Sequence, residues 1–295
     1  MGSIVEPSQF SNAKNTHLFY WRKSSQFLVF VRSGANCPAW LENIENIDVL
    51  VSLYDKPADW KIPYRGYAGA ATGGLSKFHA FKSLADAYPE LLEYAFVLFL
   101  DADITMDAAS LQSAFQRGLE RRLDCFQLAL SDSSYSAFPF LFQRGNAAFR
   151  QTNFVEVMAP FMSRAYLKRV LDTFDQSIST WGLDLLWSFQ YTTPACGVLN
   201  DLLMYHEDYP DAHNGPFYRY LQGLGIDAEL EMCKLLAQHC IWMDYPHDGP
   251  SWSFTWWGRW FWRPVAWLQR RLAKRQIKQR WRTIQQEKSQ NSKPL

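Results

Sequence analysis

The first half of the chain alternates short apolar runs with segments whose apolar residues recur at helical spacing. The runs are apolar on both faces and end at polar or turn residues, a pattern typical of strands buried between two layers. Strands that alternate with helices indicate an α/β fold, a mainly parallel sheet with helices on both faces. The predicted strands are residues 26–32, 47–54, 95–100 and 126–130, and the predicted helices are 75–88 and 108–122.

The second half is predicted to contain more helix. A short strand, with Glu156 on the face opposite Val155 and Val157, is expected before a proline break and a helix. A Trp-Gly turn at 181–182 leads into another apolar helix, and residues 214–238 are again predicted to be helical.

The segment VLFLDADIT at 97–105 carries the strongest chemical pattern. Residues two apart in an extended chain point to the same side, so Asp101 and Asp103 are expected to project together where the strand leaves the sheet. Two such carboxylates repel each other unless a cation lies between them, and oxygen ligands suit Mg²⁺ or Mn²⁺ better than Zn²⁺. A cation at this edge would stabilise a leaving diphosphate, as a nucleotide-sugar transferase requires.

Other interpretations of the acidic pair stay open. One aspartate can cap the following helix while the other is solvated. An apolar run followed by D-x-D-x-T is also how haloacid dehalogenase-like phosphatases begin, with the first aspartate as nucleophile. Those enzymes usually place the motif on the first strand and need a later Gly-Asp motif, whereas here two predicted strands precede it and no such motif follows. A non-catalytic glycan-binding protein is the third interpretation.

Three further segments accompany the acidic pair: GGLSKF at 73–78, NFVEVMAPFMSR at 153–164 and TWGLDLLW at 180–187. With these segments in this order, the chain resembles an uncharacterised glycosyltransferase-like family of bacteria and plants, over roughly residues 26 to 238. The resemblance implies a GT-A-like fold, a nucleotide-binding α/β sheet with a DxD motif. It also implies metal-dependent transfer of a sugar from a nucleotide-sugar donor to a glycan or lipid-linked acceptor.

The resemblance gives expected roles on the donor side of the site. Asp101 and Asp103 would contact the metal, Mn²⁺ or Mg²⁺, and the diphosphate. Lys77 would reach a phosphate or the base, unless it lies on a solvated helix face. His206 would be an additional metal ligand, because neutral imidazole suits Mn²⁺, unless it has only a structural role. The acidic residue that the family typically has six positions before this histidine is replaced by Asn200, with the acid one position later.

The acceptor side is expected to involve the Trp-Gly-acid segment and the carboxylate of Glu156. Trp181 offers an apolar ring on which a sugar can stack, and Asp184 follows in the first turn of the next helix. Similar segments in inverting transferases use the carboxylate to deprotonate the acceptor hydroxyl, so Asp184 is the expected base. The alternative is a helix N-terminal charge beneath a core tryptophan. Glu156 either takes part in catalysis or is paired inside the protein.

Charge is distributed unevenly along the 295 residues. No acid occurs from 249 to 286, a stretch with nine Lys or Arg, whereas residues 1–248 hold 19 basic and 28 acidic residues, a net of −9. Seven tryptophans and these basic residues in 252–282 indicate an amphipathic helical tail on an anionic membrane surface. The alternative is a tryptophan cluster that closes the core. An acidic body does not favour nucleic acid as a partner.

The expected organisation is an N-terminal extension (1–25), a GT-A-like domain (26–248) and the basic tail (249–295). The five cysteines form no C-x-x-C pair, which favours a reducing compartment. No signal peptide or apolar span is recognised. The predicted location is therefore the cytoplasm, at the inner face of the membrane.

Overall fold

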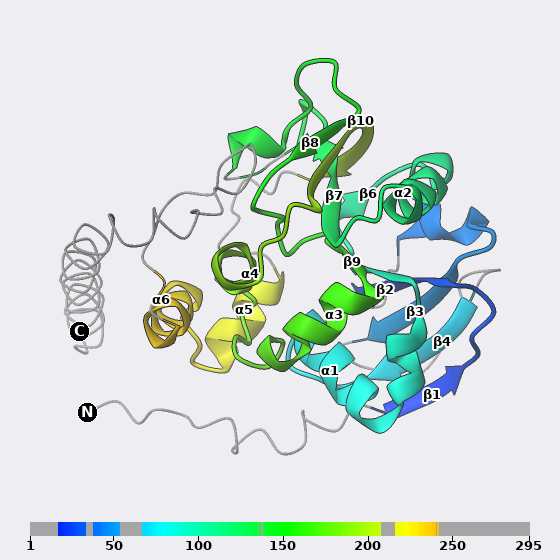
Figure 1. The fold of residues 1–295 in the computed structure, drawn as a ribbon. Helices are drawn as coiled ribbons and strands as arrows, with labels where there is room; N and C mark the ends of the chain where they lie inside the picture. Colours follow the sequence, from blue (N-terminus) through cyan, green and yellow to red (C-terminus); the bar gives the residue numbers. More distant parts are fainter. Residues whose placement is uncertain are drawn as a thin grey trace, which may run out of the picture.

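The fold is taken from a computed structural model that describes residues 17–33, 38–53, 67–134, 136, 138–207, 216–239 and 241. These residues form a ten-stranded sheet covered by helices (Figure 1). The strands are β1 (His17–Trp21), β2 (Phe27–Ser33), β3 (Asp48–Leu53), β4 (Tyr67–Thr72), β5 (Phe96–Asp101), β6 (Ile104–Thr105), β7 (Cys125–Leu130), β8 (Phe149–Gln151), β9 (Phe161–Ser163) and β10 (Cys196–His206). The helices are α1 (Lys77–Ala87), α2 (Ala108–Glu120), α3 (Arg164–Val170), α4 (Leu183–Gln190), α5 (Pro216–Gly223) and α6 (Ala228–Gln238), with 3₁₀ turns at Ala39–Asn43, Pro89–Glu93, Pro139–Leu141 and Leu171–Thr173.

The strand order is β1-β4-β3-β2-β5-β9-β7-β10-β6, with β8 paired to β10. Strands β4, β3, β2 and β5 are parallel neighbours, and β7 and β10 are parallel to each other. The short β9 lies antiparallel between β5 and β7, so those two strands point the same way. Six strands therefore share one direction, and the predicted α/β fold with a mainly parallel sheet is confirmed.

Two apolar layers cover the two faces of the sheet. Alternate residues of β2 divide between them, because successive strand side chains point to opposite faces. Val29 and Val31 pack with Phe115 of α2 on one face, and Leu28 and Phe30 pack with the layer that includes α1, α3, α4 and α6 on the other. The prediction that helices lie on both faces is confirmed.

The structure differs from the predicted elements at several places. Glu156 lies in an irregular segment rather than in a strand, because its backbone N–H donates to the side chain of Gln127 and not to the backbone of a neighbouring strand. Residues 216–238 form two helices, since Gly225, with φ of 69°, lies between them in a conformation that glycine favours. Strand β1 pairs with β4, so the sheet begins within the predicted extension 1–25.

The longest strand, β10, was not predicted as a strand. Its pairing with β7 shifts between Leu199 and Leu203, so the residues between them bulge out of the ladder. Beyond this bulge the strand pairs with β6, where His206 lies opposite Ile104. This pairing brings the end of β10 next to the acidic segment that follows β5.

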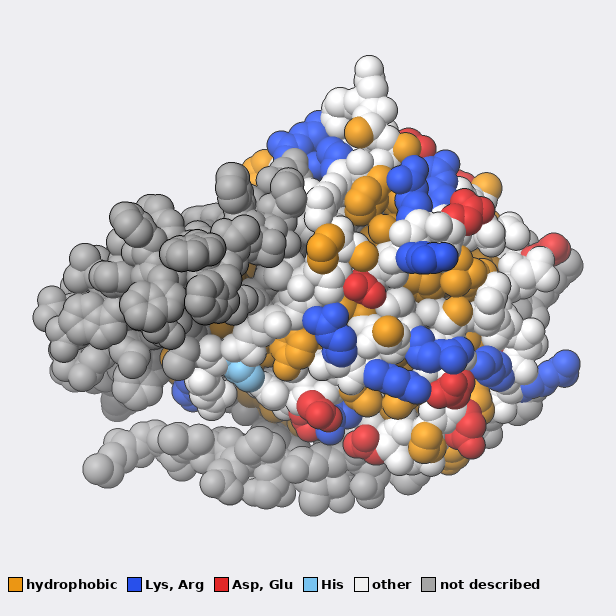
Figure 2. Space-filling view, in the orientation of Figure 1, with side chains coloured by type: hydrophobic (Ala, Val, Ile, Leu, Met, Phe, Trp, Pro, Cys, Tyr) orange, Lys and Arg blue, Asp and Glu red, His pale blue; other side chains and the backbone are white. Residues whose placement is uncertain are grey.

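The basic tail at 249–295, with the predicted amphipathic helix, lies outside the described residues. None of the described helices has the length and apolar character needed to cross a bilayer. On the face seen in Figure 2, basic and acidic side chains lie next to one another between apolar ones. Among the described residues, Glu93 forms ion pairs with Arg164 and Lys168.

Candidate active site

The carboxyl ends of β2 and β5 place the two aspartates at one edge of the sheet. Asp101 is the last residue of β5 and pairs in register with Arg32 of β2. Asp103 follows in the short turn between β5 and β6. Both side chains are partly exposed, 41% for Asp101 and 30% for Asp103. The acidic motif therefore lies where ligands of open α/β sheets bind.

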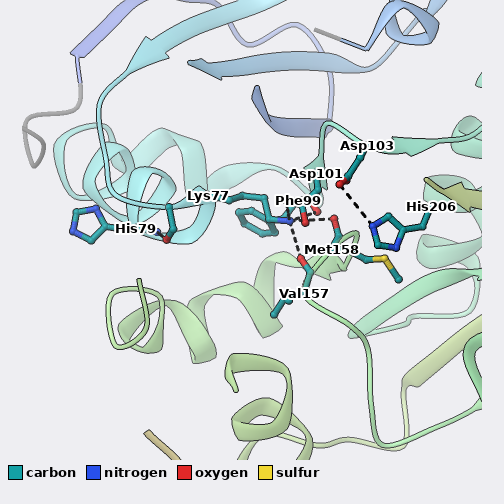
Figure 3. Close-up of polar contacts among 9 residues, drawn as sticks. Lys77, His79, Phe99, Asp101, Asp103, Val157, Met158 and His206 are labelled. Carbon is teal, nitrogen blue, oxygen red and sulfur yellow. Dashed lines mark hydrogen bonds and ion pairs between the residues drawn. The ribbon is translucent and has the colours of Figure 1, made fainter. Parts of the chain in front are cut away.

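Lys77, the first residue of α1, is 4% exposed and points toward this edge (Figure 3). Its Nζ lies 2.8 Å from Asp101 Oδ1, 2.7 Å from the carbonyl oxygen of Val157 and 3.1 Å from that of Met158. Burial lowers the pKa of Lys77, and the charge of Asp101 opposes that shift. The three N–H groups are thus directed to protein acceptors. The predicted contact between Lys77 and a phosphate or base stays a prediction, and it requires one of these bonds to be exchanged.

Lys77→Met is expected to lower the free energy of unfolding by about 1–3 kcal/mol, because it removes the donor to the Val157 carbonyl and leaves the Met158 carbonyl with the Asp101 backbone N–H alone. Urea unfolding measures the change. Lys82→Met is the matched control on the same helix: its ion pairs with Asp86 and Asp175 are exposed, so a change below about 1 kcal/mol is expected. Equal losses in the two variants would contradict a special role for Lys77.

Asp103 faces His206, which the pairing of β6 with β10 brings alongside (Figure 3). Asp103 Oδ2 lies 3.7 Å from His206 Nε2. The backbone N–H of the next residue, Glu207, donates to the carbonyl oxygen of Asp103 at 3.2 Å. Asp103 Oδ1 is buried and has no hydrogen-bond partner among the described residues. A buried carboxylate oxygen without a donor is costly unless a cation or water completes its shell.

These donors fit a divalent cation in part. Asp103 supplies an unpartnered carboxylate oxygen and His206 an imidazole nitrogen nearby, while Asp101 Oδ1 is engaged by Lys77. Among the described residues, no three side chains of His, Cys, Asp or Glu are already arranged as a ligand set. The predicted ligands thus lie at one edge of the sheet, and Asp101 needs to turn or to bind through its other oxygen. Burial and the charge of Asp103 raise the pKa of Asp101, whereas Lys77 lowers it.

Glu156 approaches the same site from the segment between β8 and β9. Its backbone N–H donates to Gln127 Oε1 at 2.8 Å, and its Oε2 accepts from the Ser136 hydroxyl at 3.1 Å. Burial raises the pKa of Glu156 to about 8, with a further contribution from the negative charge of Asp184. Near neutral pH the carboxyl is therefore mostly protonated and able to donate a hydrogen bond.

Asp184 is buried, 8% exposed, in the first turn of α4. Burial raises its pKa to about 7, while the backbone N–H groups of Leu185 and Val157 lower it by hydrogen bonding to the carboxylate. The Val157 carbonyl accepts a hydrogen bond from Lys77, so the backbone of Val157 connects Asp184 with the residues around Asp101. A carboxylate that titrates near neutral pH fulfils the requirement for a general base.

The Trp-Gly turn has the predicted form. Gly182 is the N-cap of α4 with φ of 85°, a conformation that glycine favours. The Trp181 indole N–H donates to the Tyr218 hydroxyl at 3.2 Å, and the two rings meet edge to face. Trp181 is half-buried. Its role as a platform for a sugar stays a prediction.

Two residues that organise the site were not predicted. Arg32 is buried and donates to the carbonyls of Gly73 and Gly74 at 2.7 and 2.6 Å, which fixes the turn before α1. Asn200 is buried, and its Oδ1 accepts from the backbone N–H of Arg144 in the loop before β8 and from the side chain of Arg150 in β8. For Arg32, the sequence signal was a charged residue at the end of an apolar strand. For Asn200 no comparable sequence signal was available.

Comparisons with known proteins find similar solved structures but no similar sequence. No family model matches the chain, and no curated protein is found to be similar in sequence. Solved structures that are similar include S. aureus TarS 1–349 in complex with UDP-GlcNAc (14% identity, TM-score 0.43, 72% of each chain covered). Others are a candidate nucleotide-diphospho-sugar transferase from Desulfovibrio desulfuricans G20 (12%, 0.39, 73% and 99%) and a mycobacterial protein (12%, 0.44, 76% and 83%). At these TM-scores the function has to be inferred from the site.

Proposed function

We propose that the protein is a metal-dependent glycosyltransferase, which moves a sugar from a nucleotide-sugar donor to a hydroxyl of a glycan or lipid-linked acceptor. The observation that supports this best is the convergence of four carboxyl groups on one edge of the sheet. Asp101 and Asp103 lie beside Lys77 and His206, and burial raises the pKa of Glu156 to about 8 and that of Asp184 to about 7. Perturbed pKa values that cluster in one place are typical of functional sites.

On the donor side, Asp103 and His206 would hold Mn²⁺ or Mg²⁺, with Asp101 joining through a free or reoriented oxygen. When bound, such a cation neutralises charge on the diphosphate of the leaving nucleotide. Lys77 holds Asp101 by a charge-assisted hydrogen bond and fixes the carbonyls of Val157 and Met158, which sets the distance between the donor and acceptor sides.

On the acceptor side, Asp184 takes the proton of the attacking hydroxyl as the oxygen bonds to the anomeric carbon and the bond to the diphosphate breaks. Its pKa of about 7 keeps enough of the ionised base at neutral pH. Glu156, protonated at that pH, donates a hydrogen bond to a sugar or phosphate oxygen. Trp181 supplies an apolar ring next to the base.

A thermal-shift screen of UDP, GDP, CDP and ADP, each with and without Mn²⁺, tests the donor site. One diphosphate is expected to raise the melting temperature only with Mn²⁺, because a ligand that binds the native state alone stabilises it. Stabilisation by none of them would contradict the proposal. Hydrolysis of simple phosphate esters with a covalent aspartyl-phosphate would show a phosphohydrolase instead, and metal-independent sugar binding a glycan-binding protein.

The location remains a proposal that depends on residues 252–282. The nine basic residues and the tryptophans there are suited to an anionic membrane surface, which would bring the site close to a lipid-linked acceptor.

A further inference from the structure

The loop that carries Trp181 and leads to Asp184 is held by a single carboxylate from helix α6. Glu231 Oε1 accepts from the Ile178 N–H at 2.9 Å, and its Oε2 accepts from the Ser179 N–H at 2.7 Å. The Ser177 hydroxyl lies 3.1 Å from the same Oε2. One side chain, 52 to 54 residues away in sequence, thus binds three consecutive residues of the loop.

The loop itself is strained and closely packed. Thr180 has φ of 67°, a left-handed conformation that is unfavourable for a β-branched residue and that persists only where the surroundings enforce it. Ser177 and Ser179 are fully buried. Ser179 Oγ accepts from the Trp181 N–H at 3.3 Å, and the Leu183 N–H donates to the Thr180 carbonyl at 3.2 Å. These bonds connect the residues held by Glu231 with Leu183 in the first turn of α4.

Helix α6 also contacts the end of this loop directly. A Cβ placed on Gly182 would lie 3.0 Å from Met232 Cγ, the residue after Glu231, and 3.4 Å from Leu235 Cδ2. The N-cap of α4 therefore packs closely against α6, and a side chain at Gly182 would require Met232 to move. Because Asp184 lies two residues beyond this cap, the position of its carboxylate depends on how α6 packs.

We propose that Glu231 is a positioning residue for the acceptor side: it holds the strained turn at Thr180 and so sets the positions of Trp181 and Asp184. Glu231 has no contact with the reacting atoms. This inference rests on the proposed function for its effect on transfer, but the loop restraint itself is independent of any activity.

The first test is amide hydrogen exchange of the full chain without ligands, for Glu231→Ala, Glu231→Gln and the control Lys234→Ala, which lies exposed on the same helix. Exchange of the amides from Ile178 to Asp184 is expected to rise about tenfold in Glu231→Ala, while β2 and β5 stay protected. Glu231→Gln should give a smaller rise, because its oxygen still accepts one N–H. Unchanged exchange of this loop in Glu231→Ala would overturn the proposal.

The second test uses transfer kinetics. Glu231→Ala is expected to lower kcat about tenfold with donor KM unchanged, and Lys234→Ala to change neither. Adding Thr180→Gly to Glu231→Ala is expected to restore kcat about threefold, since glycine adopts the positive φ without strain. An unchanged kcat in Glu231→Ala, or a rise in donor KM without a fall in kcat, would overturn the positioning role. If the wild type transfers no sugar, the proposed function fails while the exchange result still decides whether Glu231 restrains the loop.

Discussion

Asp103→Asn is expected to lower kcat/KM for sugar transfer by about 10²–10³-fold, the size of effect seen when one electrostatic contact to a developing charge is removed. The reason is that the carboxylate of Asp103 has Oδ2 beside His206 and a buried Oδ1 with no partner among the described residues, and an amide is a weaker ligand for a hard cation than a carboxylate. Steady-state kinetics and titration of Mn²⁺ into the protein measure the two effects.

The fold should tolerate this substitution, because removing the charge also removes repulsion from Asp101. The melting temperature without metal is therefore expected to be equal to or above that of the wild type. Asp132→Asn, an exposed acid in the turn after β7, is the control and should retain both activity and Mn²⁺ affinity. If Asp103→Asn binds Mn²⁺ as well as the wild type does, the metal site lies elsewhere.

Asp184→Asn is expected to lower kcat by about 10²–10⁴-fold, the usual contribution of a general base, with donor affinity retained. The amide oxygen can still accept from the Leu185 N–H, so the local geometry is preserved. Asp172→Asn, an exposed acid in the turn before the loop, is the control and should leave kcat unchanged. Retention of wild-type kcat in Asp184→Asn would rule out this residue as the base.

The same variant has an expected effect on stability. Asp184 has a pKa of about 7 in the folded protein against an ordinary value of 3.8. Between these values the folded state binds more protons than the unfolded state, so the free energy of unfolding falls as pH rises. Asparagine does not ionise. Asp184→Asn is therefore expected to be more stable than the wild type by about 1–3 kcal/mol near pH 8, with no advantage near pH 4.

Denaturant unfolding at the two pH values tests this difference. The control Asp172→Asn should show none of the gain, because its carboxylate is exposed. A gain in stability over the wild type that is larger near pH 4 than near pH 8 would contradict the raised pKa of Asp184. If Asp184 lowers the free energy of unfolding at the pH at which it supports transfer, its carboxylate has a functional rather than a structural role.

Periodicity identified the parallel core of the sheet and the helices that cover it. Strands β2, β3 and β5 were recognisable because both of their faces are buried, which makes them continuous apolar runs. Strand β10 was not, since it is buried on both faces only at its start and then alternates at the edge of the sheet. Strand β9 is three residues long, too short for any period to be visible.

The acidic pair was evident from sequence because a strand end is a local feature: an apolar run stops and the next side chains are at the sheet edge. The chain alone thus determined the residue types available for binding a cation and for proton transfer. Tertiary structure decided which of them meet. His206 reaches Asp103 only through the pairing of β6 with β10, and Lys77 is committed to Asp101 by packing of α1 on the sheet. Burial raises the pKa of Asp184, and Glu231 accepts hydrogen bonds from the loop before α4. Both depend on contacts between segments that are distant in sequence, so no local pattern could predict them.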